Sequence, residues 1–353
     1  MKTIAFFNNK GGVGKTTLAY HVAWMLGELG LTVLAADLDP QANLTSMFLD
    51  EEAIEALWWP RVHTDKANTI YASVDKLKRG LGDISELEQC GIASSDRLFL
   101  VPGDLGLSDF ESDLAAQWPN CLDRDERAFR VTTSFFRIIR HAAEESGADV
   151  VLIDVGPNLG AINRTALLAA DYVVIPLGPD IFSLQGLRNM GPRLRAWRKD
   201  WDERKKKNPS ADLALPPGTM QPIGYVTMRH AVRRDRPAAW FGKWIARMPE
   251  AYLRDVLDDK TTEAPSAQSD PNCLGQMKDY KSLMPMAQEA NKPMFLLKPA
   301  DGAIGGHQSA VRNCYEDFER LSQEIARRCD LPLRSDIAKS SRAKPIDLSD
   351  LGI

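Results

Sequence analysis

The sequence predicts an α/β protein with a doubly wound, mostly parallel sheet and helices on both faces. Short apolar runs that suit buried strands alternate along the chain with longer stretches of helical periodicity. The strand-like runs are almost continuously apolar, which is typical of parallel strands covered on both faces. The chain has 353 residues, of which 44% are hydrophobic, an ordinary fraction for a globular protein.

The expected elements follow one another in strand–helix order. The expected strands are 4–7, 32–36, 98–101, 150–153, 172–176 and 223–228. The expected helices are 16–27, 74–81, 109–118, 131–146 and 309–329. A further helical stretch at 185–199 carries Gly191 and Pro192 in its middle, and we expect these two residues to interrupt it.

We expect one domain over residues 1–330, because the strand–helix alternation starts in the first residues and returns near the end. Polar, punctuated segments near 50–130 and 236–280 are expected to be insertions. Within the second insertion, the Asp-, Ser- and Pro-rich residues 255–280 are expected to form a loop. Residues 331–353 are expected to be a mobile tail.

A glycine-rich loop follows the first expected strand. Residues 8–17 read Asn-Asn-Lys-Gly-Gly-Val-Gly-Lys-Thr-Thr. Gly14, Lys15 and Thr16 match the end of the Walker A pattern G-x-x-x-x-G-K-[ST], whereas Asn9 stands where its first glycine belongs. A Gly- and Lys-rich surface turn is the alternative, but strand, glycines, lysine, hydroxyl and helix fall in the order that a phosphate-binding loop requires.

The chemistry of this loop suits a nucleoside triphosphate. Its glycines allow backbone N–H groups to turn inward around phosphate oxygens, and the following helix adds its positive end. Lys15 is expected to reach the β- and γ-phosphates, and the Thr16 hydroxyl to bind Mg²⁺. The expected nucleotide-binding residues are Gly11, Gly12, Val13, Gly14, Lys15, Thr16 and Thr17. One lysine suffices for this work, so Lys10 requires a separate explanation.

Three aspartates follow the ends of expected strands. Asp37 and Asp39 alternate after 32–36, and Asp154 follows 150–153 in the manner of a Walker B strand. Carboxyl ends of parallel strands are where ligands bind in open α/β sheets, and neighbouring carboxylates favour a cation such as Mg²⁺. Each aspartate alone could equally be a helix cap or turn residue, but the phosphate loop favours a functional role.

These segments resemble those of a known family. The K-G-G-V-G-K-T-T loop, the D-L-D-P-Q-A-N segment at 37–43 and the D-V-G-P-N-L-G segment at 154–160 are similar to those of the deviant Walker A P-loop ATPases of the ParA/MinD superfamily, most of all its ParA (Soj-like) DNA-partition branch. The resemblance covers most of 1–190 and returns at about 280–328. One departure is Gly156, which replaces the first proline of the family's usual D-x-P-P switch.

The resemblance implies a role for each site residue. Lys10 would reach across an ATP-sandwiched homodimer to the partner's phosphates, a cation supplied in trans to the transferring phosphoryl group. Lys15 would bind phosphate, Thr16 would bind Mg²⁺, and Thr17 would contact the α-phosphate region. Asp39 would orient the attacking water, while Asp37 and Asp154 would support the metal shell. The implied cofactors are ATP and Mg²⁺, with slow hydrolysis stimulated by a ParB-like partner.

The charge distribution is uneven although the net charge is only −4. Residues 50–130 carry 17 acidic and 9 basic side chains, whereas residues 185–247 carry 15 basic and 5 acidic ones. ParA-like proteins bind nonspecific DNA through basic residues, and the candidates here are Arg229, Arg233, Arg234, Arg236, Lys243 and Arg247. Arg188, Arg193, Arg195, Arg198 and Lys199 add to the same basic region. The alternative is that these side chains are solvated helix faces.

Other functions on this fold are less well supported. The five cysteines lack metal-ligand spacing, which indicates a reduced, cytoplasmic protein and disfavours an iron–sulfur ATPase; DNA binding would place it on the nucleoid. A MinD-like membrane-positioning ATPase would need an amphipathic anchor, and residues 343–353 suit one poorly, so a membrane partner is not expected. A metabolite-activating ATPase is a third possibility, since the fold alone does not fix function.

Overall fold

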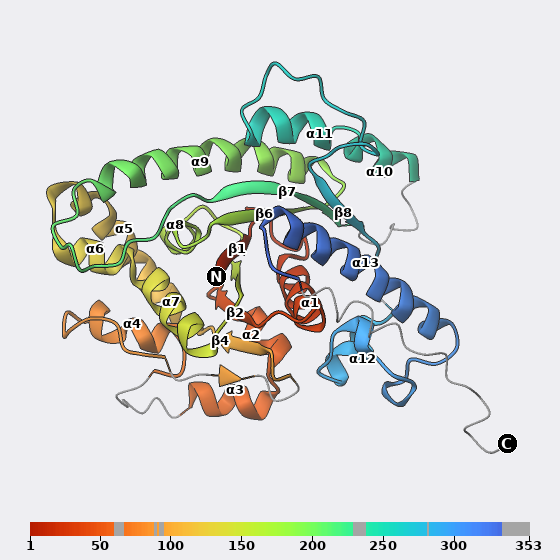
Figure 1. Cartoon of the computed structure of the whole chain (residues 1–353), viewed down its shortest axis with the longest axis horizontal. Coiled ribbons are helices and arrows are strands. Elements are labelled where there is room, and N and C mark those ends of the chain that lie inside the picture. The colour runs from red at the N-terminus through yellow and green to blue at the C-terminus, as the bar shows by residue number, and fades with distance from the viewer. Residues whose placement is uncertain (60–66, 88–89, 92–94, 229–237, 281, 334–353) are drawn as a thin grey trace.

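The computed structural model describes residues 1–59, 67–87, 90–91, 95–228, 238–280 and 282–333. Within these ranges, eight strands form one sheet in the order β3-β4-β2-β5-β1-β6-β7-β8 (Figure 1). All neighbouring pairs are parallel except β3 with β4. The strands are β1 (Lys2–Phe6), β2 (Val33–Leu38), β3 (Cys90–Gly91), β4 (Leu98–Val101), β5 (Val150–Val155), β6 (Tyr172–Leu177), β7 (Gln221–Met228) and β8 (Cys273–Met277). The expected fold class is confirmed.

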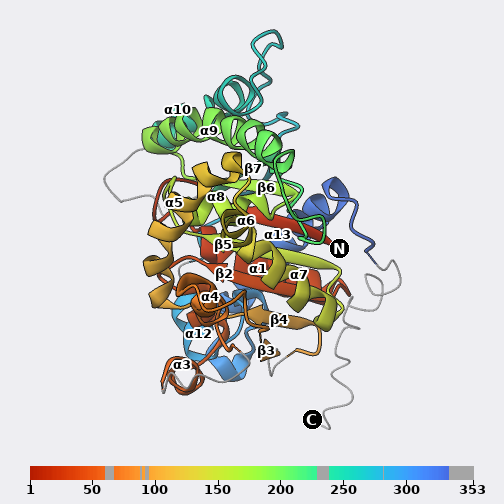
Figure 2. The same ribbon diagram turned by 90° about the vertical axis from the view of Figure 1, so that its left-hand side faces the viewer.

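Helices cover both faces of the sheet, as Figure 2 shows from the side. One face packs against α1 (Lys15–Glu28), α2 (Asn43–Phe48), α12 (Met284–Glu289) and α13 (Gly306–Arg328). The other packs against α4 (Ile70–Lys78), α5 (Glu111–Asn120), α6 (Glu126–Thr132), α7 (Ser134–Ser146), α8 (Ala161–Leu168) and α9 (Ile181–Lys205). Successive strand residues alternate between these two cores: Ile4 and Phe6 join the first, and Ala5 joins the second.

Eight further helical segments complete the described part of the chain. They are α3 (Glu51–Trp58), α10 (Ala238–Ile245), α11 (Met248–Ala251), the 3₁₀ turns η1 (Leu105–Phe110), η2 (Cys121–Asp123), η4 (Met294–Leu296) and η5 (Pro299–Asp301), and the π-helical turn η3 (Tyr252–Val256). Among them, α11 and η3 pack onto α9 at the top of Figure 1. The described part of residues 50–130 contains several helices and strands β3 and β4 at the edge of the sheet, in line with the helices expected at 74–81 and 109–118 and the strand expected at 98–101.

The sheet order places the carboxyl ends of three strands together. In the central part of the sheet, β1 lies between β5 and β6, and the chain leaves β1 and β5 toward opposite sides. The register pairs Asp37 of β2 with Asp154 of β5, and Asp154 with Phe6 of β1. This is the switch point at which open α/β sheets bind ligands.

The expected interruption of the helix at 185–199 is wrong. Residues Ile181–Lys205 form one continuous helix of 25 residues that contains Pro192. Core packing of Leu187 and Leu194 on either side holds the two halves in line. Gly191 has a different purpose, since a Cβ there would lie 2.0 Å from the Asp255 carbonyl oxygen. The glycine lets the backbone of η3 approach α9 closely.

Two other expectations need adjustment. The loop expected over 255–280 contains β8, which extends the sheet by pairing with β7 from Tyr225 to Met228, so a plain loop is wrong for 273–277. The helix expected at 131–146 is divided at Thr133 between α6 and α7. Of the expected tail, Leu331 is buried, and residues 334–353 lie outside the described residues.

Candidate functional site

The glycine-rich loop joins β1 to α1 at the switch point. Gly12 and Gly14 have φ values of 70° and 84°, a region that side chains with a Cβ rarely adopt. Gly14 is the N-cap of α1 and supplies no side-chain hydrogen bond to the helix. The first N–H groups of α1 therefore have no side-chain cap, and they are available to an anion.

Asn8 fixes the start of this loop to the sheet. Its amide nitrogen donates to the Pro176 carbonyl of β6 at 2.6 Å, and its amide oxygen accepts from the Lys10 backbone N–H at 2.9 Å. The loop also lies close to α9, because a Cβ on Gly186 would come within 2.8 Å of Asn9 Oδ1. Gly186 therefore lets α9 pack directly against the loop.

Lys15 is the buried cation of the site. Its side chain is 7% exposed, and its Nζ lies 3.5 Å from the Lys10 carbonyl oxygen. Burial lowers the pKa of Lys15, and the nearby Asp154 and Asp39 carboxylates oppose that shift. A phosphate in the loop would supply the negative charge that stabilises the buried ammonium.

Asp37 is held in a fixed position at the end of β2. The side chain is fully buried and accepts hydrogen bonds from the Thr45 N–H and hydroxyl, both at 2.8 Å. Thr45 Oγ1 also accepts from the Gly103 N–H at 2.8 Å, so α2 and the turn after β4 both support this carboxylate. Burial raises the pKa of Asp37 to about 7, against the lowering effect of the Thr45 hydrogen bonds.

Asp154 is the least satisfied polar group at the site. It is fully buried, and neither carboxylate oxygen has a hydrogen-bond partner among the described residues. Burial and then the Asp37 charge raise the pKa of Asp154 to about 8, whereas the nearby Thr16 hydroxyl and Lys15 lower it. An unsatisfied carboxylate beside a second one in a dry site is the arrangement that a divalent cation stabilises.

The donors around Asp154 fit Mg²⁺ of the kind that accompanies a nucleotide. No group of three acidic, histidine or cysteine side chains converges as a metal site in the described part of the chain. Mg²⁺ with nucleotides typically takes one or two protein carboxylates and completes its shell with phosphate oxygens and water. Thr16, Asp154 and Asp37 would provide that protein contribution.

Asp39 lies at the rim of the same site. It is 6% exposed, and its Oδ1 accepts from the Gln41 N–H at 3.0 Å. A Cβ on Gly156 would come within 3.3 Å of this oxygen, so the segment after β5 lies directly against Asp39. A Cβ on Gly11 would in turn lie 3.8 Å from Pro157 Cγ. The loop, the Asp39 segment and the 156–158 segment therefore meet at one place.

Lys10 points away from these carboxylates and pairs with Asp180. Asp180 is the N-cap of α9 and also accepts from the Ser183 N–H at 2.9 Å. Although burial opposes ionisation, the Lys10 and Ser183 hydrogen bonds keep the pKa of Asp180 below its usual value. The Lys10 Nζ lies 5.9 Å from the centre of the Phe182 ring, which is 69% exposed.

Sequence reasoning did not find Asp180. The sequence does contain a signal for it, because Asp180 precedes a helix and Ser183 follows three residues later, a common N-cap pattern. That pattern predicts a cap but gives no indication that Lys10, 170 residues away, binds the same carboxylate.

The candidate DNA-binding residues are only partly described. Arg229, Arg233, Arg234 and Arg236 lie outside the described residues. Lys243 and Arg247 are exposed and flank Trp244, with their charged ends 5.5 Å and 5.4 Å from its ring centre. Both cations are thus at the surface, next to a buried tryptophan. In the described part of the chain, no helix has the length and apolar character needed to cross a membrane.

Comparison with known sequences identifies relatives of the first half of the chain. A family model described as an AAA domain matches residues 1–206. The uncharacterized protein MJECL24 of Methanocaldococcus jannaschii is 33% identical over 190 residues, 54% of this chain and 64% of that protein. The sporulation initiation inhibitor protein Soj of Bacillus subtilis is 28% identical over 198 residues, 56% of this chain and 66% of Soj. The chain thus spans just under two thirds of the length of these relatives.

Solved structures extend the likeness to nearly the whole chain. Protein DIP2308 from Corynebacterium diphtheriae matches with a TM-score of 0.64 and 26% identity, covering 93% of this chain and 99% of that one. A putative plasmid partition protein from Borrelia burgdorferi B31, bound to AMPPNP, matches with a TM-score of 0.54 and 20% identity, covering 92% and 98%. At 20% identity the second likeness supports the fold alone.

Proposed function

We propose that the chain is a ParA-like ATPase that dimerises on ATP and binds nonspecific DNA. The chain belongs to the AAA domain family and to the ParA/MinD superfamily of ATPases, and the proposal proceeds from that membership. Hydrolysis of ATP would partition or position a DNA cargo. The observation that carries the proposal is the meeting of the phosphate loop, the buried Asp37 and Asp154 and the rim residue Asp39 at one switch point.

The loop and its neighbours divide the work on the substrate ATP. Backbone N–H groups of 11–16 and the Lys15 ammonium bind the β- and γ-phosphates. Thr16, Asp154 and Asp37 would hold Mg²⁺, which would neutralise charge on the phosphate oxygens when bound. Asp39, which lies against the segment after β5, orients a water whose oxygen attacks the γ-phosphorus while the bond to the β–γ bridging oxygen breaks. ADP and phosphate are the products.

Lys10 would complete the site only in a dimer. Within one subunit it pairs with Asp180 at the start of α9 and leaves the carboxylates around Lys15 without it. Transfer of its ammonium to the partner's ATP would place a positive charge on the transferring phosphoryl group. Hydrolysis would therefore depend on the oligomeric state, which is the requirement for an ATP-driven switch that a partner protein accelerates.

The experiment separates the dimer switch from hydrolysis. In the hydrolysis-impaired variant Asp39→Ala, ATP with Mg²⁺ is expected to convert monomer to dimer in analytical ultracentrifugation, and ADP is not. The matched variant Asp39→Ala/Lys10→Ala is expected to bind ATP and remain monomeric. An Asp39→Ala protein that stays monomeric with saturating ATP contradicts the dimer switch.

The DNA part of the proposal is tested with the same proteins. A labelled duplex of arbitrary sequence is expected to bind wild type with ATP more tightly than with ADP or without nucleotide. Because the contacts are to phosphates, the affinity should fall steeply between two salt concentrations. Binding should be lost in Lys10→Ala. Absence of binding in every nucleotide state contradicts the DNA part and leaves the ATPase part standing.

A further inference from the structure

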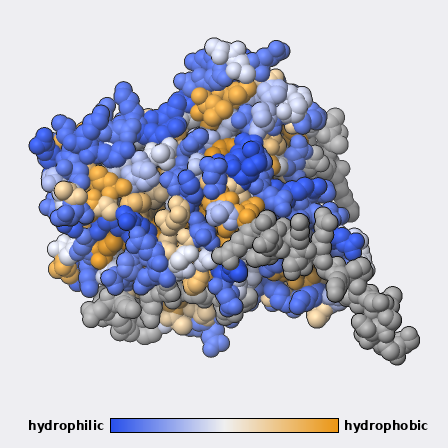
Figure 3. Space-filling view, in the orientation of Figure 1, coloured by the Kyte–Doolittle hydropathy of each residue, from blue (hydrophilic) through white to orange (hydrophobic). Residues whose placement is uncertain are grey.

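The second half of α9 carries an open groove lined by cations. The groove has a volume of about 670 Å³, and its cationic residues are Arg195, Arg198, Lys199 and Lys206. Asp202 and Glu203 of α9 also line it, so the cations outnumber the carboxylates by four to two, and its other walls are the start of β7 and the end of η3. We call it the α9 groove. Figure 3 shows the upper edge of the molecule, over α9, as predominantly hydrophilic.

Helical spacing places these cations on one side of α9. Residues 198, 199 and 206 lie three, four and eleven positions after Arg195, which places all four on a single helix face. The same face also carries Asp202, which pairs with Lys205 at 2.8 Å. The opposite face carries Leu194, Trp197 and Trp201, all buried in the core. The core packing therefore fixes the direction in which the cations project.

Most of these cations have no anionic partner. Arg198, Lys199 and Lys206 form no ion pair within the described part of the chain, and Arg198 has only a 3.4 Å contact with the Leu194 carbonyl. Arg195 is the exception, since its Nη2 lies 3.7 Å from Asp258 Oδ1, and it also donates to the Asp255 and Val256 carbonyls at 2.9 Å and 2.8 Å, which anchors η3. Burial and the Arg195 charge lower the pKa of Arg198, as expected for cations held close together. An external anion would relieve this repulsion.

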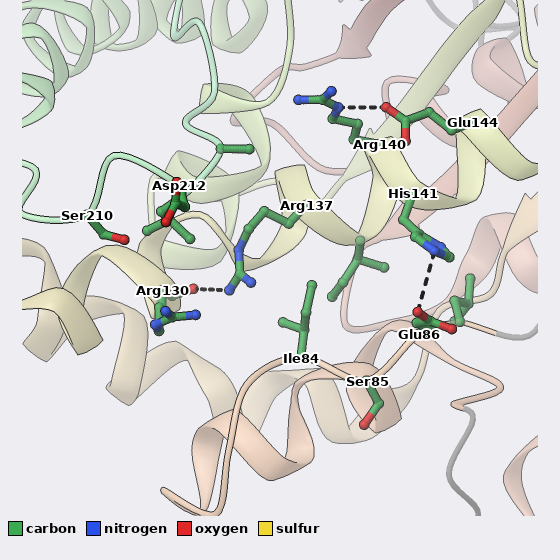
Figure 4. Close-up of a pocket in the computed structure, with 14 residues that line it drawn as sticks. Ile84, Ser85, Glu86, Arg130, Arg137, Arg140, His141, Glu144, Ser210 and Asp212 are labelled. Carbon is green, nitrogen blue, oxygen red and sulfur yellow. Dashed lines mark hydrogen bonds and ion pairs between the residues drawn. The ribbon is translucent and has the colours of Figure 1, made fainter.

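A second cavity contains arginines that are already paired with carboxylates of the protein. A cavity of about 710 Å³ between α7, residues 84–87 and residues 210–214 also contains arginines (Figure 4). There Arg137 makes two hydrogen bonds with Asp83, at 2.7 Å and 2.9 Å, and Arg140 donates to Glu144 at 2.8 Å. These arginines are paired with carboxylates of the protein, whereas Arg198, Lys199 and Lys206 of the α9 groove form no ion pair within the described residues.

The geometry points to the phosphate backbone of duplex DNA as the ligand of the α9 groove. Eleven residues of helix separate Arg195 from Lys206, roughly 16 Å at 1.5 Å per residue, or the length of about five base pairs. A linear stripe of this length suits a polymer of phosphates better than one free phosphate. This inference rests on the proposed function and assigns its DNA contact to α9, beside the region of Lys243 and Arg247.

The phosphate of an anionic lipid headgroup could also bind these cations, but the groove suits a membrane surface less well than it suits DNA. Membrane-surface segments combine cations with a continuous apolar face. Of the residues lining the α9 groove, Leu257 is the one large apolar side chain with substantial exposure, at 40%. The groove therefore supplies charge without the apolar area that holds a protein on a bilayer.

The test reverses the charge at the two exposed lysines of the groove, Lys199 and Lys206. Lys199→Glu/Lys206→Glu in the full chain, with ATP and Mg²⁺, is expected to bind labelled duplex at least tenfold more weakly than wild type. Loss of two phosphate contacts should also lower the slope of log affinity against log salt by about 1.8 per engaged subunit. Lys199→Gln/Lys206→Gln should show the same direction with a smaller effect. Basal ATP hydrolysis and thermal unfolding verify that each variant is folded.

The matched control has the same change in net charge elsewhere. Lys76 on α4 and Arg312 on α13 are exposed and form no ion pair within the described residues, so Lys76→Glu/Arg312→Glu should bind DNA within about twofold of wild type. Equal losses in both pairs, or wild-type affinity in the groove variants, overturn the assignment while the proposed function stands. Wild type that binds no DNA overturns both. Lost binding to phosphatidylglycerol vesicles with unchanged DNA binding also overturns the groove assignment.

Discussion

The phosphate-loop site and the α9 groove are opposite arrangements of charge. At the loop, Asp37 and Asp154 are fully buried carboxylates beside a buried lysine. On α9, Lys199 and Lys206 are exposed cations without a protein anion in the described part of the chain. The carboxylates of the first outnumber its one buried lysine, and the cations of the second outnumber its carboxylates, so each suits a ligand of the opposite sign.

Burial is the difference that decides what each region can do. In the dry loop site, desolvation raises the pKa values of Asp37 and Asp154 to about 7 and about 8, so small changes in geometry or ligand have large energetic effects. In the α9 groove, water screens each charge, and an individual contact contributes little. Buried charge therefore suits chemistry on one substrate, and exposed charge suits salt-sensitive binding of a polymer.

The largest expected effect comes from removing Lys15, the buried cation of the loop. Lys15→Ala should lower steady-state ATP hydrolysis by about 10³-fold or more, because Lys15 is the buried cation of the loop, and the other loop lysine, Lys10, pairs with Asp180. Binding of a fluorescent ATP analogue should also be lost. Lys199→Glu/Lys206→Glu, which changes more charge, should retain basal hydrolysis. Retained hydrolysis in Lys15→Ala would mean that the loop is not the catalytic site.

The next effect is the pH dependence of stability without ligand. Asp37 and Asp154 have raised pKa values, so the folded protein holds protons that the unfolded chain has already released. The free energy of unfolding should therefore fall as pH rises, by on the order of 2 kcal/mol between pH 6.5 and 8.5. Below pH 6.5 the buried His21, whose pKa burial lowers to about 4, has the opposite effect.

Thermal unfolding at pH 6.5 and 8.5 measures this slope. Asp154→Asn should flatten the pH profile and raise the unfolding temperature at pH 8.5 by a few degrees, because a neutral amide replaces a buried carboxylate. Saturating Mg²⁺ and ATP should flatten the wild-type profile in the same way. An unfolding temperature that rises with pH across this window would show that the two carboxylates are stabilised by something other than protonation.

The positions of the site residues that lie in sequence motifs or at strand ends could be predicted from the sequence. The phosphate loop requires glycines, a lysine and a hydroxyl in a fixed order, so Gly12, Lys15 and Thr16 could be placed from the sequence alone. Asp37 and Asp154 could be placed beside each other because both end parallel strands of one sheet.

Contacts between distant segments could not be predicted in the same way. The pairing of Lys10 with Asp180 depends on how α9 packs against the loop through Gly186. The basic character of α9 was visible in the sequence, but its groove also needs η3, which approaches only because Gly191 has no side chain. Strand β8 is short and contains Gly275, so it gives little local signal and forms by pairing with β7.

The smallest expected effect concerns Lys10, a residue of the phosphate loop whose side chain already has an anionic partner in Asp180. Asp180→Asn removes the charge that holds Lys10 but retains an N-cap oxygen for the Ser183 N–H. Since half-exposed ion pairs contribute about 0.2–1 kcal/mol, freeing Lys10 should strengthen ATP-dependent dimerisation of Asp39→Ala by about two- to fivefold. Sedimentation over a concentration series measures it. The gain should vanish in Lys10→Ala/Asp180→Asn on the same background. A weaker dimer would instead mean that Asp180 positions Lys10 for the partner's ATP rather than withholding it.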